Sequence, residues 1–265
     1  MKNCEVLIVG YGSIGKRYEK YLSTMPNVNV SIVEIFSDAR ELAKSKNLDV
    51  YSNLEDDVFE KHYDYGIISN WGPDHVKTGN LLIKNSIKNI TIEKPFCNNL
   101  YSGKKFLNKI NELKIRCNVH FRWPYLGLLQ EVKNLENEFD MGEASFINVL
   151  GGAGCLSTGG IHWMDFACRY FNESPLVISG VHGIENINPR SRDLGYVDGS
   201  CIYIFEDNKK LSFSLDNKSS IALETKLFYK YGYISIDANS QIRVFNRNKE
   251  DIELASKKIT RYGIP

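Results

Sequence analysis

The sequence predicts two folds in succession: a doubly wound parallel α/β sheet at the N-terminus, then an α+β part with a mostly antiparallel, open sheet and few helices. Three observations predict this. The first half of the 265 residues alternates short β-rich runs with helical stretches. A glycine-rich turn at 10–15 joins the first run to the first helix. After about residue 121, longer runs are separated by turn residues instead of helices.

The composition of the chain allows two modest domains. Hydrophobic residues make up 43% of the chain and charged residues 25%, as in ordinary globular proteins. We place the boundary where the pattern changes, and expect an α/β domain at 1–120 and an α+β domain at 121–265.

The runs of the first half are rich in apolar and β-branched residues, which is typical of strands in a buried parallel sheet. We expect strands at about 4–9, 28–35, 64–69, 88–92 and 115–120, with a short further strand near Val50. We expect helices at 13–24, 38–47, 73–86 and 98–113. Candidate N-caps for the last three are Asp38, Asp74 and Asn98.

The second half begins with a helical linker at 125–137 and has one further helix at about 160–171. Its candidate strands are 143–150, 176–187, 196–206, 210–216, 222–230, 233–238 and 241–246. Turn residues such as Asp207-Asn208, Asp216-Asn217 and Tyr231-Gly232 separate several of them. An antiparallel sheet is the simplest packing for strands connected in this way.

Composition argues against several classes of function. The 33 basic and 32 acidic side chains nearly cancel, so we expect no nucleic-acid partner. Since there is neither a membrane-length apolar run nor a signal-peptide pattern at the start, we expect a cytoplasmic protein with no membrane partner. The six scattered cysteines form no Cys-x-x-Cys pair, so we expect reduced thiols and no metal site.

The motif Gly10-Tyr11-Gly12-Ser13-Ile14-Gly15 lies between a predicted strand and a predicted helix, where a dinucleotide-binding turn is expected. The first glycine permits the tight turn, the second lets the backbone approach a pyrophosphate, and the third allows close helix packing. We expect Gly10, Gly12, Ser13, Ile14 and Gly15 to bind the cofactor. The alternative is a glycine-rich turn that binds nothing.

Glu34 ends the second predicted strand, where a carboxylate can accept hydrogen bonds from the ribose hydroxyls of a dinucleotide. A carboxylate there repels a 2′-phosphate, and the next arginine downstream is Arg40. The sequence therefore indicates NAD, with NADP possible. The alternative is a strand-end carboxylate that faces water.

Polar loops follow the other strands at the same edge of the predicted sheet, where ligands bind in doubly wound folds. They contain Asn70, Trp71 and His75 after one strand, Glu93-Lys94-Pro95 after the next, and His120 and Arg122 after the last. We expect them to face one crevice. Asn70, Trp71, His75, Glu93 and Lys94 are candidate cofactor ligands, although His75 and His120 also fit purely structural roles.

In three motifs the chain resembles the glucose-fructose oxidoreductase and inositol dehydrogenase-like (Gfo/Idh/MocA) family: Gly10 to Gly15, Glu93-Lys94-Pro95 and Gly159-Gly160-Ile161-His162-Trp163-Met164-Asp165. Their order and spacing match over about 4–171. The resemblance implies a Rossmann domain, a second domain for substrate and oligomerisation, and NAD(P)-dependent oxidation or reduction of a small molecule. It also implies that Lys94 lies beside the nicotinamide and that the Lys94-Pro95 bond is cis.

The resemblance further implies a catalytic role for His162. We assign His162 as general base and Lys94 as the group that orients the substrate oxygen and stabilises its negative charge. Asp165, three residues later on the same helical face, could orient the imidazole or bind a substrate hydroxyl. Arg122 could bind an anionic group of the substrate or only tether the linker. Thr158 stands where many polyol-specific members have Asp, which makes inositol itself a poorer candidate substrate.

The chain ends at 265 residues, earlier than typical members, which predicts a shortened second domain. An uncovered apolar sheet face would favour self-association, so we expect a homo-oligomer formed through the C-terminal sheet.

Three functions remain as hypotheses from sequence. The first is hydride transfer between NAD(H) and a hydroxyl or keto carbon of a sugar, nucleotide sugar or polyol. The second is a catalytically silent NAD(P)-binding sensor or assembly protein. Thr158 would suit it, and so would Asn70-Trp71-Gly72, because members of the family usually have Thr-Pro-Asn-like residues there. The third is a reductase of a non-sugar substrate.

Overall fold

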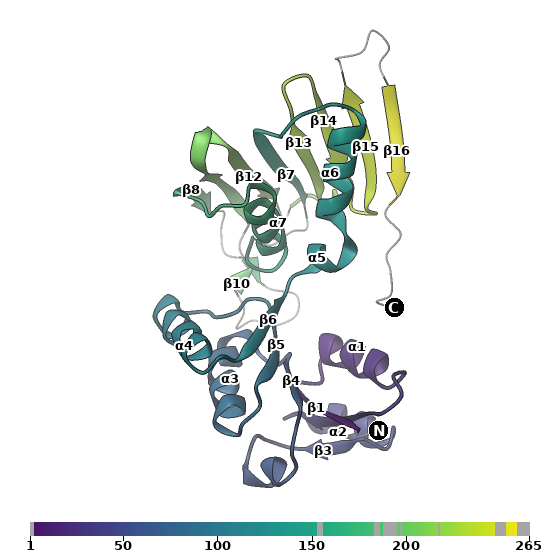
Figure 1. Cartoon of the computed structure of the whole chain (residues 1–265), viewed down its shortest axis with the longest axis vertical. Helices are drawn as coiled ribbons and strands as arrows, with labels where there is room; N and C mark the ends of the chain where they lie inside the picture. The colour runs from purple at the N-terminus through teal and green to yellow at the C-terminus, as the bar shows by residue number, and fades with distance from the viewer. Residues whose placement is uncertain are drawn as a thin grey trace. The chain divides into compact units, whose positions relative to one another are not determined.

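The computed structural model describes residues 3–152, 156–182, 186–187, 195–196, 198–216, 218–246 and 253–258. It divides into two compact units, one ending at His120 and the next beginning at Phe121 (Figure 1). The strands and the hydrophobic cores of each unit are its own. Within the described residues, no helix is both long enough and apolar enough to cross a bilayer.

The first unit contains a six-stranded parallel sheet. Its strands are β1 (Cys4–Val9), β2 (Val28–Val33), β3 (Asp49–Tyr51), β4 (Tyr65–Ile68), β5 (Asn89–Glu93) and β6 (Arg116–His120). Their order is β3-β2-β1-β4-β5-β6, so the direction of winding reverses between β1 and β4. This order confirms the doubly wound fold, and it places the topological switch point beside the glycine turn that follows β1.

Helices cover both faces of this sheet. They are α1 (Ser13–Leu22), α2 (Ser37–Lys44), α3 (His75–Lys84) and α4 (Leu100–Glu112), with short 3₁₀ turns η1 (Asp56–Glu60) and η2 (Gly72–Asp74). Side chains of α1 and α2 pack on one face in a core around Ile8 and Ile32. Those of α3 and α4 pack on the other, around Leu7 and Ile90. Alternate residues of one strand thus enter two cores, because successive side chains of a strand point to opposite faces.

Two of the three predicted N-caps are wrong, and the third, Asp74, is at the predicted position. Asn99, not Asn98, caps α4, and its side chain accepts a hydrogen bond of 3.0 Å from the backbone N–H of Ser102. Helix α2 begins one residue before Asp38, which therefore lies inside the first turn. Asp74 is the N-cap of α3 but makes no side-chain capping bond. Adjacent residues with equal capping propensity are distinguished only by where the loop turns into the helix.

The second unit contains α5 (Arg122–Leu126), α6 (Leu128–Glu138), the π-helical turn η3 (Leu156–Gly160), α7 (Ile161–Phe171) and the 3₁₀ turn η4 (Glu206–Asn208). Its main strands are β7 (Phe146–Gly152), β8 (Val177–His182), β11 (Gly199–Ile204), β12 (Lys210–Asp216), β13 (Glu224–Phe228), β14 (Gly232–Ile236), β15 (Gln241–Asn246) and β16 (Glu253–Lys258). The short strands β9 (Asn186–Ile187) and β10 (Gly195–Tyr196) form a separate pair.

The large sheet has the order β16-β15-β14-β13-β7-β12-β11-β8, and all its pairs are antiparallel except β7 with β12. This confirms a mostly antiparallel sheet, but three expectations were wrong. The linker helix is broken at Gly127, which adopts a left-handed φ of 65°. The expected strands 176–187 and 196–206 are each divided into two. Strand β16, which is rich in charge, was not expected at all.

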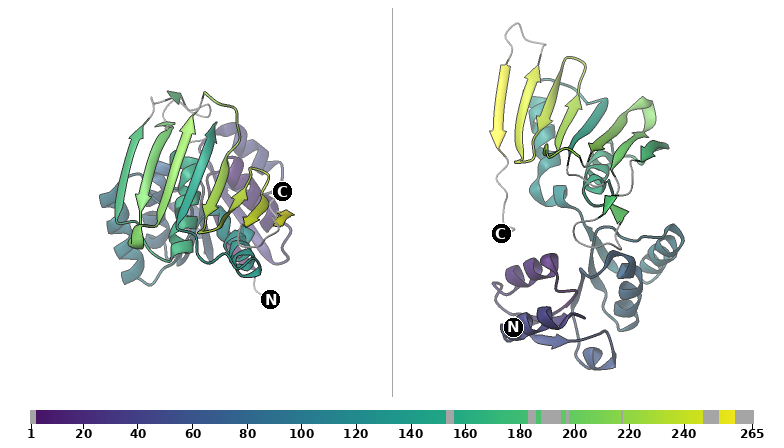
Figure 2. Two further views of the ribbon diagram at one scale, coloured as in Figure 1. Left: turned by 90° about the horizontal axis from the view of Figure 1, so that it is seen from above. Right: turned by 180° about the vertical axis from the view of Figure 1, so that it is seen from behind.

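Helices α6 and α7 lie on one face of this sheet (Figures 1 and 2). The core beneath them contains Ile147, Leu211, Leu227 and Ile234 from successive strands. By alternation, the intervening residues form the opposite face, and no described helix packs on it. Four aromatic residues there lie in a row across neighbouring strands; they are Phe146, Phe228, Tyr233 and Phe245, with ring centroids 5.5, 6.3 and 5.2 Å apart in that order.

Candidate functional site

The glycine turn is held against the loop that follows β4. A Cβ atom at Gly10, whose φ is 94°, would lie 2.5 Å from the backbone of Asn70, and one at Gly15 would lie 2.0 Å from the carbonyl oxygen of Gly10. The hydroxyl of Ser69 donates to that same carbonyl oxygen at 2.8 Å. The protein itself therefore requires glycine at positions 10 and 15.

Gly12 is different, because a Cβ atom there would meet no atom of the described part of the chain within 4 Å. Gly12 and Ser13 are exposed, Ile14 is half-buried, and Gly12 is the N-cap of α1 without any side-chain capping bond. The first turn of α1 thus presents backbone N–H groups beside a position that the protein leaves open. This combination fits the pyrophosphate of a dinucleotide.

Tyr11 anchors the turn in a way that sequence reasoning missed. Its side chain is completely buried, and its hydroxyl donates to Glu19 at 2.7 Å and accepts from Lys46 at 3.1 Å. Lys46 and Glu19 also form an ion pair. The sequence did contain a signal for this buried position, because Tyr11 is a large aromatic residue between two glycines. A loop side chain of that size is expected to pack into a hydrophobic core.

Glu34 faces the glycine turn. It is only 6% exposed, so the alternative of a carboxylate facing water is wrong. Its Oε2 accepts from the backbone N–H of Tyr11 at 2.6 Å, and its Oε1 accepts from that of Phe36 at 2.9 Å. Arg40 donates to the carbonyl oxygens of Glu34 and Ile35, at 3.1 and 2.5 Å. Backbone amides therefore fix this carboxylate at the end of β2.

The loop after β4 carries Asn70 and Trp71. The side-chain amide of Asn70 donates to Thr78 at 2.9 Å, while its Oδ1 is buried and has no hydrogen-bond partner among the described residues. Trp71 is 38% exposed at the start of η2. The loop contacts the glycine turn through the backbone of Asn70 and through the hydroxyl of Ser69.

His75 joins two loops of the site. It is 1% exposed, its Nδ1 lies 2.8 Å from the carbonyl oxygen of Pro95, and its Nε2 lies 3.2 Å from that of Asn70. Both ring nitrogens therefore face carbonyl oxygens of the protein. This placement argues against direct cofactor contact and for a role in holding the Asn70 and Pro95 loops together.

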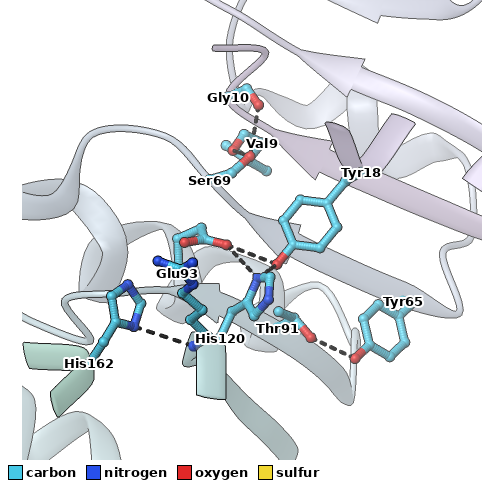
Figure 3. Close-up of polar contacts among 10 residues, drawn as sticks. Val9, Gly10, Tyr18, Tyr65, Ser69, Thr91, Glu93, His120 and His162 are labelled. Atoms are coloured by element: carbon cyan, nitrogen blue, oxygen red, sulfur yellow. Dashed lines mark hydrogen bonds and ion pairs between the residues drawn. The ribbon is translucent and has the colours of Figure 1, made fainter. Parts of the chain in front are cut away.

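The Lys94-Pro95 peptide bond is cis, as the resemblance implied. The preceding residue, Glu93, ends β5 and is buried. Its carboxylate accepts from the hydroxyl of Tyr18 at 2.9 Å and from Nδ1 of His120 at 2.7 Å, and the Tyr18 hydroxyl also contacts that nitrogen (Figure 3). The sequence placed His120 at this edge of the sheet but did not connect Tyr18 with the site.

In the second unit, the structure brings His162 and Arg122 together. His162 is in the first turn of α7, and its Nδ1 accepts from the backbone N–H of Arg122 at 3.3 Å (Figure 3). The Arg122 guanidinium lies 4.5 Å from the ring centroid of Trp123, which packs on Trp163 at 4.4 Å. A neutral imidazole that accepts at Nδ1 carries its proton on Nε2.

Asp165 makes its hydrogen bonds with Arg169, whose Nε donates to both carboxylate oxygens at 3.0 Å. Burial raises the pKa of Asp165, and Arg169 opposes that rise. The carboxylate is thus paired along its own helix. Thr158 lies in η3, immediately before this helix. The ranges that the structure describes contain no cluster of His, Cys, Asp or Glu that could hold a metal ion.

Comparisons with known proteins agree with this geometry. Residues 4–121 match the model of a family described as an oxidoreductase family with an NAD-binding Rossmann fold. No curated protein matches the chain.

Solved structures share the fold of the whole chain. UDP-N-acetylglucosamine 3-dehydrogenase from Acidithiobacillus ferrooxidans is 12% identical, with a TM-score of 0.78 over 100% of this chain and 86% of that one. Myo-inositol 2-dehydrogenase from Lactobacillus plantarum is 16% identical, with a TM-score of 0.76 over 99% and 84%. An oxidoreductase from Agrobacterium radiobacter, in complex with NAD⁺, L-tartaric acid and magnesium, is 12% identical, with a TM-score of 0.78 over 98% and 80%.

Proposed function

Because residues 4–121 match the model of the Gfo/Idh/MocA family of NAD-binding oxidoreductases, we propose that the chain transfers a hydride between NAD(H) and a hydroxyl or keto carbon of a sugar, nucleotide sugar or polyol. The observation that carries the proposal is the open position at Gly12, at the uncapped start of α1 and beside the switch point of the sheet. The names of the similar structures, dehydrogenases of a nucleotide sugar and of an inositol, support this substrate class.

Glu34 supports NAD as the preferred cofactor. Its carboxylate is fixed beside the glycine turn and still has lone pairs that can accept from ribose hydroxyls. A 2′-phosphate at the same place would meet this negative charge. Arg40, the nearest downstream arginine, donates to backbone carbonyls of the same loop, which helps to hold that loop in place.

When bound, the nicotinamide ring supplies the hydride acceptor or donor. We assign Lys94 to orient the substrate oxygen and to stabilise negative charge on it, because it directly follows the buried end of β5. Arg122, Thr158, His162 and Asp165 are assigned to the substrate side. In this proposal 1–120 is the dinucleotide-binding domain and 121–265 the substrate and oligomerisation domain.

Two roles fit His162. Sequence reasoning assigned it as the general base. The hydrogen bond from Arg122 favours the tautomer with its proton on Nε2, which instead donates a hydrogen bond to the substrate oxygen.

Variants of His162 distinguish the two roles. Replacing His162 with Gln keeps an N–H donor, whereas Leu removes it. A donor role predicts that the Gln variant retains much more activity than the Leu variant. An equal loss of activity in both variants, together with loss of the pH dependence of the rate near neutrality, would identify His162 as the general base.

We also propose that a second copy of the chain covers the open face of the large sheet. The aromatic row Phe146, Phe228, Tyr233 and Phe245 supplies apolar contact area. Lys226 and Glu224 lie on the same face. A face with both signs of charge can pair with itself through a two-fold axis.

The proposed reaction is tested with the Lys94→Ala variant and a panel of sugars, nucleotide sugars and polyols. Wild-type protein should change NAD absorbance with at least one panel member, because the panel covers the proposed class. The variant should lose about 100-fold or more of that rate while binding NADH nearly as well. If wild-type protein binds NADH but turns over no panel member, the sensor or a non-sugar reductase replaces the proposed activity.

A further inference from the structure

The side chains of Tyr18 and His120 meet at the carboxylate of Glu93 (Figure 3). These three residues, which come from separate elements, are called the Glu93 cluster below. Tyr18 lies on α1, three residues after Gly15, and His120 ends β6. The aromatic and imidazole rings are 5.5 Å apart. The cluster therefore connects the helix that starts at the glycine turn, the end of β5 and the end of β6.

The protons of the cluster can be placed from its geometry. An ionised carboxylate only accepts, so both the Tyr18 hydroxyl and the His120 Nδ1–H donate to Oε1 of Glu93. The close contact between Tyr18 and His120 then directs the same N–H toward the tyrosine oxygen as well. Such charge-assisted hydrogen bonds are stronger than neutral ones and fix the carboxylate in position.

The cluster acts on a buried charge next to Lys94. Burial by itself would raise the pKa of Glu93, but the hydrogen bonds from His120 and Tyr18 and the charge of Lys94 lower it below its usual value. The Glu93 side chain is only 11% exposed, so water screens its interaction with the Lys94 amine weakly. A carboxylate free to turn toward that amine would hold it as an ammonium ion.

We propose that Tyr18 and His120 are positioning residues, which hold the Glu93 carboxylate and through it set the protonation of the neighbouring Lys94 amine. The proposal rests on the proposed function of Lys94. Neither residue needs to touch the substrate, because both act through the carboxylate that they share.

The test measures the Lys94 amine directly and needs no substrate. Folded protein without cofactor is briefly labelled with trace acetic anhydride between about pH 7 and 10, and each lysine peptide is quantified by mass spectrometry. Exposed Lys77 on α3 serves as the internal reference. In Tyr18→Phe and His120→Leu, Lys94 labelling relative to Lys77 should fall about threefold or more, equivalent to half a pKa unit.

The conservative variant His120→Asn retains an N–H donor near the position of Nδ1 and should restore labelling to nearly the wild-type level. Two matched controls should leave Lys94 labelling unchanged. Tyr21→Phe removes a hydroxyl from the same helix at a residue that is 52% exposed. His62→Leu removes an exposed histidine that also pairs with a carboxylate, that of Asp64 at 3.3 Å.

Action through Glu93 is tested with Glu93→Gln, which removes the charge and should raise Lys94 labelling. In that background, Tyr18→Phe should have no further effect. Unchanged Lys94 labelling in both Tyr18→Phe and His120→Leu, with thermal unfolding showing folded protein, would overturn the proposal. So would an effect of Tyr18→Phe that adds to that of Glu93→Gln. Should His120→Leu fail to fold, Tyr18→Phe decides, since it removes a single oxygen.

The same labelling separates this inference from the proposed function. NADH should protect Lys94 in wild-type protein if the amine lies at the nicotinamide. Absence of protection would contradict the role of Lys94 in cofactor chemistry, whereas the variants without cofactor test the cluster by itself.

Discussion

At the scale of single residues, the glycines of the turn are present for two different reasons. Gly10 and Gly15 are needed by the protein, since a Cβ atom at either would overlap backbone atoms. Gly12 has no such neighbour and is exposed at the start of α1. The motif alone gives all three glycines the same weight, whereas the surroundings of each show which one is left for a ligand.

We therefore expect Gly12→Ala to leave the midpoint of thermal unfolding nearly unchanged but to weaken NADH binding about tenfold or more, because the added methyl group occupies the approach to the pyrophosphate. Calorimetric titration with NADH and a thermal melt measure the two quantities. Gly15→Ala is the contrasting variant and should lower the unfolding midpoint. Normal NADH affinity in Gly12→Ala would mean that the phosphates of the cofactor do not bind at the start of α1.

At the scale of elements, the packing of α3 on α4 depends on one close approach. A Cβ atom at Gly79 would lie 2.3 Å from Cζ of Phe106, a side chain that is itself only 1% exposed. Helix α3 begins at His75, which holds the Asn70 and Pro95 loops. The distance between these two helices therefore also affects the loops that form the candidate site.

Gly79→Ala should lower the free energy of unfolding by about 1–3 kcal/mol, because the buried Phe106 ring has to move to accept the methyl group. Urea denaturation followed by circular dichroism measures this change. Lys77→Ala, an exposed change on the same helix, should have almost no effect. Equal stability of the two variants would mean that the two helices can separate at no cost.

At the scale of the whole molecule, the two units differ in how their sheets are covered. The first sheet has helices on both faces, whereas the described helices α6 and α7 lie on one face of the second. The aromatic row on the other face spans four neighbouring strands from β7 to β15. Such a continuous apolar strip on a sheet is typical of an interface.

Phe228→Glu, in the middle of that row, should convert an oligomer of wild-type protein into monomers, because each two-fold contact would bury the new charge. Light scattering coupled to size-exclusion chromatography measures the mass. Ile221→Glu is the control, because this residue is 68% exposed outside the strands and should not affect assembly. A wild-type monomer at all concentrations would refute the proposed interface.

The sequence by itself determined the parallel sheet, the position of its glycine turn and the presence of Glu93, Lys94 and His162 in recognisable motifs. These features are local: hydrophobic period, turn chemistry and short spacings lie within a few residues of one another. The pairing of β1 with β4, the orientation of Glu34 toward Tyr11, and the contacts of His75 with two loops were decided only by tertiary structure. So was the Glu93 cluster, whose members are 75 and 27 residues apart. No sequence spacing encodes such contacts, because they exist only once separate strands end at the same edge of a sheet.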